Sequence, residues 1–115
     1  MDKLLSKAIT ATRKYCNKSP TGELDTFYSL SDDSKEAIVV IKYMQIEKHG
    51  HGKIKHENYY VNRTLAIKAV VAMMDVLNSH GVECEVKEFQ EFSFGFEVSI
   101  DHEKIKKTVI HTMKD

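Results

Sequence analysis

Three histidines lie within eight residues of the chain, and their imidazoles could bind a metal ion. The three are His49, His51 and His56, and Glu47 and Glu57 lie beside them. Imidazoles two residues apart on an extended strand point to the same side, so they could supply ligands for zinc. The glycines between them instead favour the tip of a hairpin, where histidines are usually solvated. We favour the solvated turn, and a pH-sensitive ion pair between Glu47 and His56 is a third interpretation.

A basic and aromatic cluster follows the histidines and could bind an anion. Residues 48–68 contain five basic side chains and one acidic side chain. Cationic groups beside the start of a helix suit a phosphate, and a tyrosine ring can stack on a base. The candidate ligand-binding residues are Lys53, Lys55, Tyr59, Tyr60, Arg63 and Lys68.

The order helix, sheet, helix over residues 3–79 resembles the double-stranded RNA-binding domain. Such domains place a basic cluster at the start of their last helix. The resemblance therefore implies RNA as a partner, with Arg63 and Lys68 in the contact. The chain has only these two cations there, and its 17 basic and 17 acidic residues cancel. A nucleic-acid binder usually carries excess positive charge, so RNA or nucleotide binding is the second hypothesis, and a solvated basic surface is its alternative.

Catalytic signatures are missing from the sequence. The chain has no glycine-rich phosphate loop, no GxSxG turn and no HExxH pair. Its two cysteines, Cys16 and Cys84, have no histidine beside them in the sequence, and acidic residues such as Glu85 alternate with apolar ones as on a solvated strand face. We therefore expect no enzymatic activity and no cofactor, with an enzyme or a metal-binding protein as the third hypothesis.

Hydrophobic periodicity predicts helices and strands in alternation. The expected elements are helices over 3–17 and 64–79 and after Asp101, with strands over 25–30, 36–47, 53–61, 82–87 and 92–101. Gly81 is expected to end the second helix. Residues 31–34 could be a hairpin turn, or Asp33 followed by Glu36 could be a capping box that begins a helix over 32–47. We choose the turn, because a run of Ile and Val fits a pleated surface better than a helix.

These elements predict one α+β domain over residues 1–115. The order is α-βββ-α-ββ-α, with an antiparallel sheet and helices on one face, and its first strand is the least certain. A chain of 115 residues, 42% of them hydrophobic, can bury roughly two thirds of its unfolded surface without disulfides. Two cysteines form no disulfide framework, and the chain shows neither a secretory h-region nor a long apolar run, so we expect a cytoplasmic protein with no membrane contact.

The strand expected over residues 37–46 is apolar on both of its faces. Alternation places Val39, Ile41 and Tyr43 on one face. The other face is expected to carry Ile38, Val40 and Met44. Such a strand needs cover on two sides, and so short a chain has few helices for that purpose. We therefore expect one face to bind a partner, and we take Val39, Ile41 and Tyr43 as the contact residues.

The full α-βββ-α-ββ-α order is similar to that of the small dimeric chaperones of type III secretion. The resemblance implies an apolar sheet or helix surface that accepts an extended segment of a partner. The first hypothesis is therefore a small non-catalytic binding or regulatory protein that acts through protein contact. It could be an adaptor, a chaperone-like homodimer or an inhibitor of a larger enzyme, and self-association is the simplest form.

Overall fold

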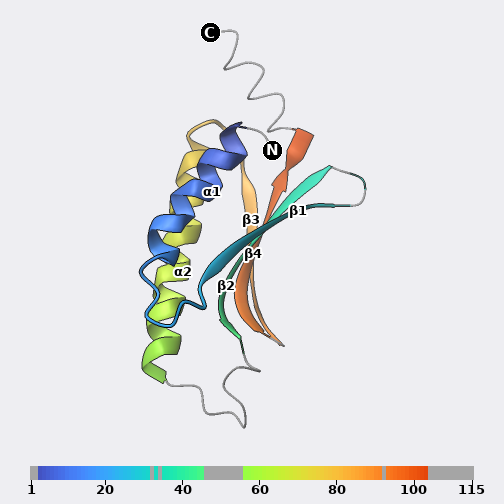
Figure 1. The fold of residues 1–115 in the computed structure, drawn as a ribbon. Coiled ribbons are helices and arrows are strands. Elements are labelled where there is room, and N and C mark those ends of the chain that lie inside the picture. Colours follow the sequence, from blue (N-terminus) through green and yellow to red (C-terminus); the bar gives the residue numbers. More distant parts are fainter. Residues whose placement is uncertain (1–2, 32, 34, 46–55, 92, 104–115) are drawn as a thin grey trace.

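The computed structural model describes residues 3–31, 33, 35–45, 56–91 and 93–103. Its elements are α1 (Lys3–Cys16), β1 (Asp25–Leu30), β2 (Glu36–Gln45), α2 (His56–Asn78), β3 (Cys84–Gln90) and β4 (Ser93–Asp101). The four strands form one antiparallel sheet in the order β1-β2-β4-β3. Figure 1 shows α1 and α2 side by side on one face of this sheet. The predicted α+β class, with helices on one face, is confirmed.

A hairpin turn joins β1 to β2, as predicted. The Ser31 amide donates to the Glu36 carbonyl over 2.9 Å. The Asp33 carboxylate accepts from the Ser31 hydroxyl at 2.7 Å and from the Lys35 amide at 3.0 Å, and these bonds lower the pKa of Asp33. Residues 37–42 then pair with β1, and residues 36–42, 44 and 45 pair with β4. The helical interpretation of residues 32–47 is therefore wrong.

The third strand expected over residues 53–61 is wrong from residue 56 onwards, because α2 already begins at His56. Residues 53–55 lie outside the described part. Side chains that pack inward recur at three and four residues from Tyr59 through Asn62, Ala66 and Ala69 to Met73. That helical spacing extends the core face of the predicted helix two turns upstream, and its packing outweighs the strand preference of Tyr-Tyr-Val. The order of elements is thus α-β-β-α-β-β.

Gly81 ends α2 in the manner that the sequence predicts. Its φ is 74°, a conformation that favours glycine. The Gly81 amide donates to the Asn78 carbonyl at 3.0 Å, and the Val82 amide reaches back to the Leu77 carbonyl at 3.0 Å. These two bonds make a Schellman motif, and the side chains of Leu77 and Val82 are both fully buried beside it. The motif turns the chain directly into β3.

The two faces of β2 have different neighbours. Val39 and Ile41 are 0% exposed on the face that the helices cover, whereas Ile38 and Val40 are only half-buried on the other face. The pairing with β4 shifts between Lys42 and Met44, which marks a bulge at Tyr43. Because of this extra residue, both Tyr43 and Met44 are buried on the helical side. Simple alternation had placed Met44 on the face of Ile38, and that assignment is wrong.

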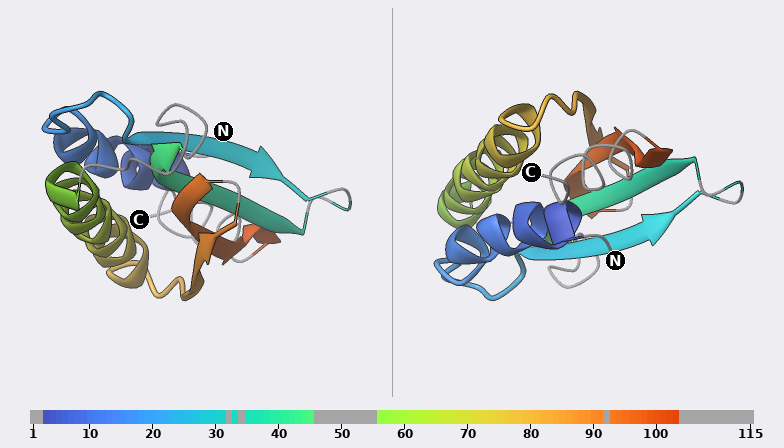
Figure 2. Two further views of the ribbon diagram at one scale, coloured as in Figure 1. Left: turned by 90° about the horizontal axis from the view of Figure 1, so that it is seen from below. Right: turned by 90° about the horizontal axis from the view of Figure 1, so that it is seen from above.

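The hydrophobic core lies between the two helices and the covered face of the sheet. α2 packs against α1 and against the sheet. Its remaining side has no neighbouring element among the described residues, as the end-on views of Figure 2 show. The predicted helix after Asp101 falls almost entirely on residues 104–115, outside the described residues. The buried apolar side chains are Leu4, Leu5, Ala8, Ile9, Leu24, Ala37, Val39, Ile41, Tyr43, Met44, Ala66, Ala69, Val70, Met73, Leu77, Val82, Phe96, Val98 and Ile100.

Candidate functional site

A polar cluster joins α2 to the sheet at the bulge of β2. The Tyr43 hydroxyl donates to the Glu88 Oε2 atom at 2.8 Å. Arg63 of α2 contacts both carboxylate oxygens of Glu88, with Nε 2.9 Å from Oε2 and Nη2 3.1 Å from Oε1. The Gln90 amide donates to the Tyr59 hydroxyl at 2.9 Å. Tyr43 lies on the helical side beside Arg63, as alternation predicts, and the residue that the bulge moves to the unexpected face is Met44.

The electrostatics of this cluster hold each group in its ordinary protonation state. Burial, and then hydrogen bonding, raises the pKa of Tyr43. The hydrogen bonds from Arg63 hold the pKa of Glu88 below its usual range, and the same bonds raise the pKa of Arg63. All three shifts lead away from neutrality. The cluster can therefore fix α2 to β2 and β3, and none of its three ionised or ionisable members is poised to exchange a proton near pH 7.

Aromatic rings surround the polar cluster. The Tyr43 ring centroid lies 5.7 Å from that of Tyr59, 6.1 Å from that of Phe94 and 5.7 Å from that of Phe96. The Arg63 guanidinium carbon lies 6.0 Å from the Phe96 ring centroid. These contacts are typical of aromatic packing in a protein interior. Tyr59 and Arg63 thus have structural partners within the chain.

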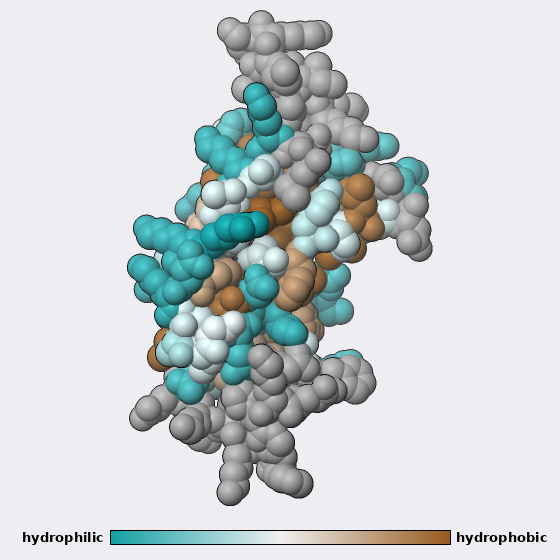
Figure 3. Space-filling view, viewed as in Figure 1, coloured by the Kyte–Doolittle hydropathy of each residue, from teal (hydrophilic) through white to brown (hydrophobic). Residues whose placement is uncertain are grey.

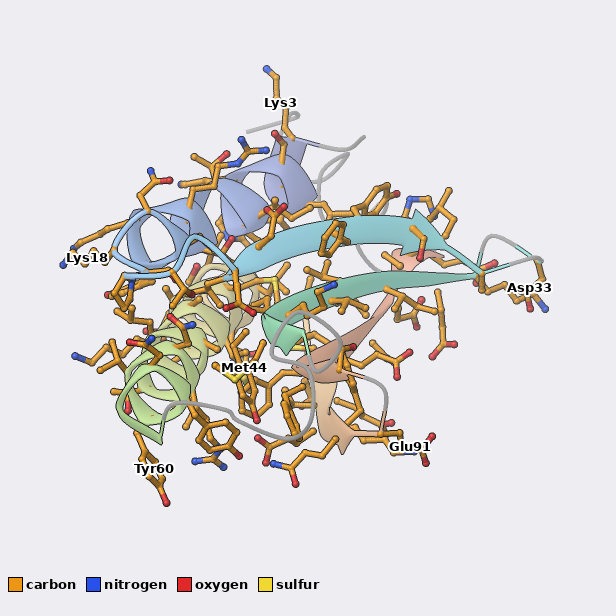
Figure 4. The ribbon with its side chains drawn as sticks, turned by 60° about the horizontal axis from the view of Figure 1, so that its bottom comes forward. Lys3, Lys18, Asp33, Met44, Tyr60 and Glu91 are labelled. Carbon is orange, nitrogen blue, oxygen red and sulfur yellow. The ribbon has the colours of Figure 1, made fainter. Side chains whose placement is uncertain are left out.

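Four of the residues predicted to bind RNA or an anion are described, and these four do not form one basic surface. Lys53 and Lys55 lie outside the described residues. Arg63 is paired with Glu88, and its side chain is 37% exposed. Tyr60 is 63% exposed and points away from the body of the protein in Figure 4. Lys68 is exposed further along α2. Within the described part, the structure therefore adds nothing that favours a phosphate site.

The histidines predicted to bind metal cannot be placed. His49 and His51 lie outside the described residues, and His56 is described only as the first residue of α2. In the part of the chain that the structure describes, no group of three His, Cys, Asp or Glu side chains could hold a metal ion.

The residues predicted to contact a partner lie on the covered face of the sheet, so this prediction is wrong. Val39, Ile41 and Tyr43 are each 0% exposed and pack against the helices. The reason is that both helices cover the face on which these three side chains lie, so a partner cannot reach them. The accessible side of β2 is instead that of Ile38 and Val40.

The uncovered side of the sheet, which we term the open face, is a mixed apolar and charged surface. Phe27 lies opposite Val40 across β1 and β2, and its side chain is 48% exposed. Val40 in turn lies opposite Glu97 of β4, and Phe89 of β3 packs over Gly95. Figure 3, which looks onto the β1 edge of the sheet, shows brown apolar patches among teal polar side chains. The residues of the open face are Asp25, Phe27, Ser29, Glu36, Ile38, Val40, Lys42, Glu85, Lys87, Phe89, Gly95, Glu97, Ser99 and Asp101.

The two cysteines are part of the packing. The Cys16 Sγ atom lies 3.4 Å from the Thr26 hydroxyl, which also lies 2.9 Å from the hydroxyl of Thr12. Cys84 is half-buried on β3, and burial raises the pKa of its thiol. A raised pKa leaves little thiolate near neutral pH, and thiolate is the reactive form.

No family model matches the chain, and no curated protein matches it significantly. Neither helix of the described residues has the combination of length and apolar character that a membrane span requires.

Proposed function

We propose that this chain is a small non-catalytic binding protein whose open face contacts another protein. The observation that carries the proposal is the one-sided cover of the sheet. Both helices pack on the face of Val39 and Ile41, while Phe27, Ile38 and Val40 lie on the opposite face without an overlying element among the described residues. Antiparallel sheets often have one solvated face, but such a face is usually polar. Adjacent apolar side chains there favour a contact surface.

Phe27 is the anchor of this proposed contact. About half of its side chain is exposed, and burial of that half would contribute on the order of 1 kcal/mol to binding. Aromatic side chains commonly dominate interface energies when they fill a dry centre surrounded by polar groups. The Lys42 ammonium already lies 5.8 Å from the Phe27 ring centroid. Lys42 therefore belongs to the polar rim of the contact.

The charges of the open face indicate the chemistry of the partner. Asp25 lies opposite Lys42, and Lys87 lies opposite Glu97, so these four residues are arranged as pairs of opposite charge. The remaining charges of the open face are all acidic and lie toward one end of the sheet. They are Glu36, Glu85 and Asp101, and they line a surface hollow of about 510 Å³. A segment that carries both basic and apolar side chains would complement this surface.

Two short synthetic peptides test the proposal. One alternates lysine with valine, and in the other glutamate replaces lysine. We expect the lysine peptide to bind saturably in fluorescence anisotropy, with an affinity that falls as salt is added. The glutamate peptide should not bind. Equal binding of both peptides, or binding of neither, would contradict the proposed partner chemistry.

A matched pair of variants locates the contact on β1. Phe27→Thr removes an exposed ring from the open face, and Leu30→Thr removes a 42% exposed side chain from the opposite face of the same strand. Threonine keeps the strand preference in both cases. We expect Phe27→Thr to weaken binding of the lysine peptide about tenfold and Leu30→Thr to leave it unchanged. An equal loss in both variants would place the contact elsewhere.

A further inference from the structure

The outer side of α2 exposes apolar side chains along most of its length. Tyr60 is 63% exposed, Val61 44%, Ile67 38% and Val71 49%. Thr64, Lys68 and Asp75 are exposed between these apolar side chains. A surface helix of a globular protein usually confines its apolar side chains to the face that packs on the core. Here α1 and the sheet cover only part of α2, as Figure 2 shows. This side of α2 therefore carries exposed apolar side chains, flanked by polar ones, that have no covering element among the described residues.

The spacing on this side is that of a helix which packs against another helix. Alternating steps of four and three residues along α2 connect Tyr60, Thr64, Ile67, Val71, Met74 and Asn78. Tyr60, Ile67 and Val71 are the exposed apolar members of this series, and Met74 is partly buried against the core. A repeat of 3.5 residues keeps the same seam facing a partner helix in left-handed pairing. We term this seam the α2 stripe. From Tyr60 to Met74 it extends about 21 Å at 1.5 Å per residue.

Two charged side chains beside the α2 stripe, Lys68 and Asp75, favour a second copy of α2 as the partner helix. Lys68 and Asp75 are seven residues apart, so they lie on the same edge of the stripe, two turns from each other. Within the described part of the chain, neither side chain has a hydrogen-bond or ion-pair partner. If two copies of α2 pack antiparallel with Val71 near the two-fold axis, Lys68 of each copy faces Asp75 of the other. The edge is thus complementary to itself.

We propose that a second copy of this chain docks antiparallel on the α2 stripe. This inference goes beyond the proposed function, because the stripe lies on the helical layer and shares no residue with the open face. A single helix pair of this length buries less area than a standard stable interface. The dimer is therefore reversible, and its population rises with protein concentration.

Charge exchange tests the arrangement of the two copies. We expect sedimentation equilibrium of the whole protein to show a monomer–dimer equilibrium between low micromolar and near-millimolar concentrations. Lys68→Glu alone, or Asp75→Lys alone, places like charges opposite each other at both ends and should weaken the dimer roughly tenfold. The double variant should regain the affinity of the original chain. An equimolar mixture of the two single variants should also associate, because each then faces an opposite charge.

Two further variants keep the test decisive. Val71→Asp places a charge beside the axis and should give a monomer, while circular dichroism verifies that α2 remains folded. Phe27→Thr changes only the open face and should leave the dimer intact. A monomer at every concentration, or single charge variants that associate like the original chain, would overturn the antiparallel dimer. Loss of association in Phe27→Thr would overturn it too, and would instead assign a second copy to the open face.

Discussion

Replacement of Glu88 by glutamine tests whether the polar cluster fixes α2 to the sheet. Glu88 accepts two hydrogen bonds from Arg63 and one from Tyr43. Glutamine has nearly the same shape, but it carries no charge and offers one acceptor oxygen in place of two. The Tyr43 hydroxyl and the Arg63 Nε share one oxygen of Glu88, and Nη2 uses the other. The amide group of Glu88→Gln therefore faces either Nη2 alone or both Nε and the Tyr43 hydroxyl.

The expected loss of stability follows from these bonds. A hydrogen bond to a charged group contributes about 1.5–3 kcal/mol, and a neutral one about 0.5–1.5 kcal/mol. The side chains of Arg63 and Glu88 are 37% and 27% exposed, so water screens part of the attraction between them. We therefore take the lower half of the range and expect Glu88→Gln to lower the free energy of unfolding by about 1–2 kcal/mol.

Urea denaturation measures this loss directly. With a slope of about 2 kcal/mol per molar urea, typical of a small domain, the midpoint should fall by about 0.5–1 M. Glu85→Gln is the matched control, because Glu85 is exposed on the same strand and faces away from Arg63. A midpoint unchanged in Glu88→Gln, or lowered equally in both variants, would refute the assignment of a structural role to the cluster.

The contribution of Glu88 to the free energy of unfolding falls as the pH is lowered. The folded protein lowers the pKa of Glu88, so the ionised carboxylate contributes stability above the pKa of an unfolded glutamate, about 4.3. That contribution is lost as the pH falls through the lower folded pKa. Glu88→Gln should therefore lose less stability than the original chain on acidification below about pH 4.

Three further predictions concern residues outside this cluster. A Cβ at Gly95 would lie 2.8 Å from the Ile41 carbonyl oxygen, so Gly95→Ala should cost about 1–3 kcal/mol of stability, measurable by urea denaturation, and a neutral result would contradict the close approach of β4 to β2. Asn62 is 0% exposed and its amide donates to the Thr21 hydroxyl at 2.9 Å. Asn62→Ala should cost about 1–3 kcal/mol and speed amide exchange near Thr21; unchanged exchange there would refute its role as an anchor. Because burial raises the pKa of Cys84, iodoacetamide should label its thiol slowly at neutral pH and faster as the pH rises, as followed by mass spectrometry, whereas labelling at the rate of a free thiol would contradict burial.

Local patterns predicted those parts of the fold in which one periodicity is unambiguous. The alternation over 93–101 gave a strand with Phe96, Val98 and Ile100 facing the core. The end of α2 was predictable because a glycine that follows a long apolar helix commonly adopts the left-handed conformation that ends a helix, as Gly81 does. The start of α2 was missed because Tyr59, Tyr60 and Val61 favour strands, while the buried Asn62 hid the helical period that continues through them.

The sequence predicted that one face of β2 lacks cover, but the prediction of which face was wrong. The two apolar faces of β2 indicated that one face lacks cover, but sequence alone does not say which face the helices choose. Val39 and Ile41 were predicted to contact a partner, but the helices cover the face on which they lie. The bulge at Tyr43 and the ion pair between Arg63 and Glu88 join residues far apart in the chain, so no local pattern could reveal them.

Amide chemical-shift mapping of the whole protein tests the central claim most directly. On titration with the lysine–valine peptide, we predict saturable shifts at Phe27, Ile38, Val40 and Phe89, with little change along α1 and α2. Shifts confined to the helices, or a spectrum unaltered at peptide excess, would contradict the open face as the site of protein contact.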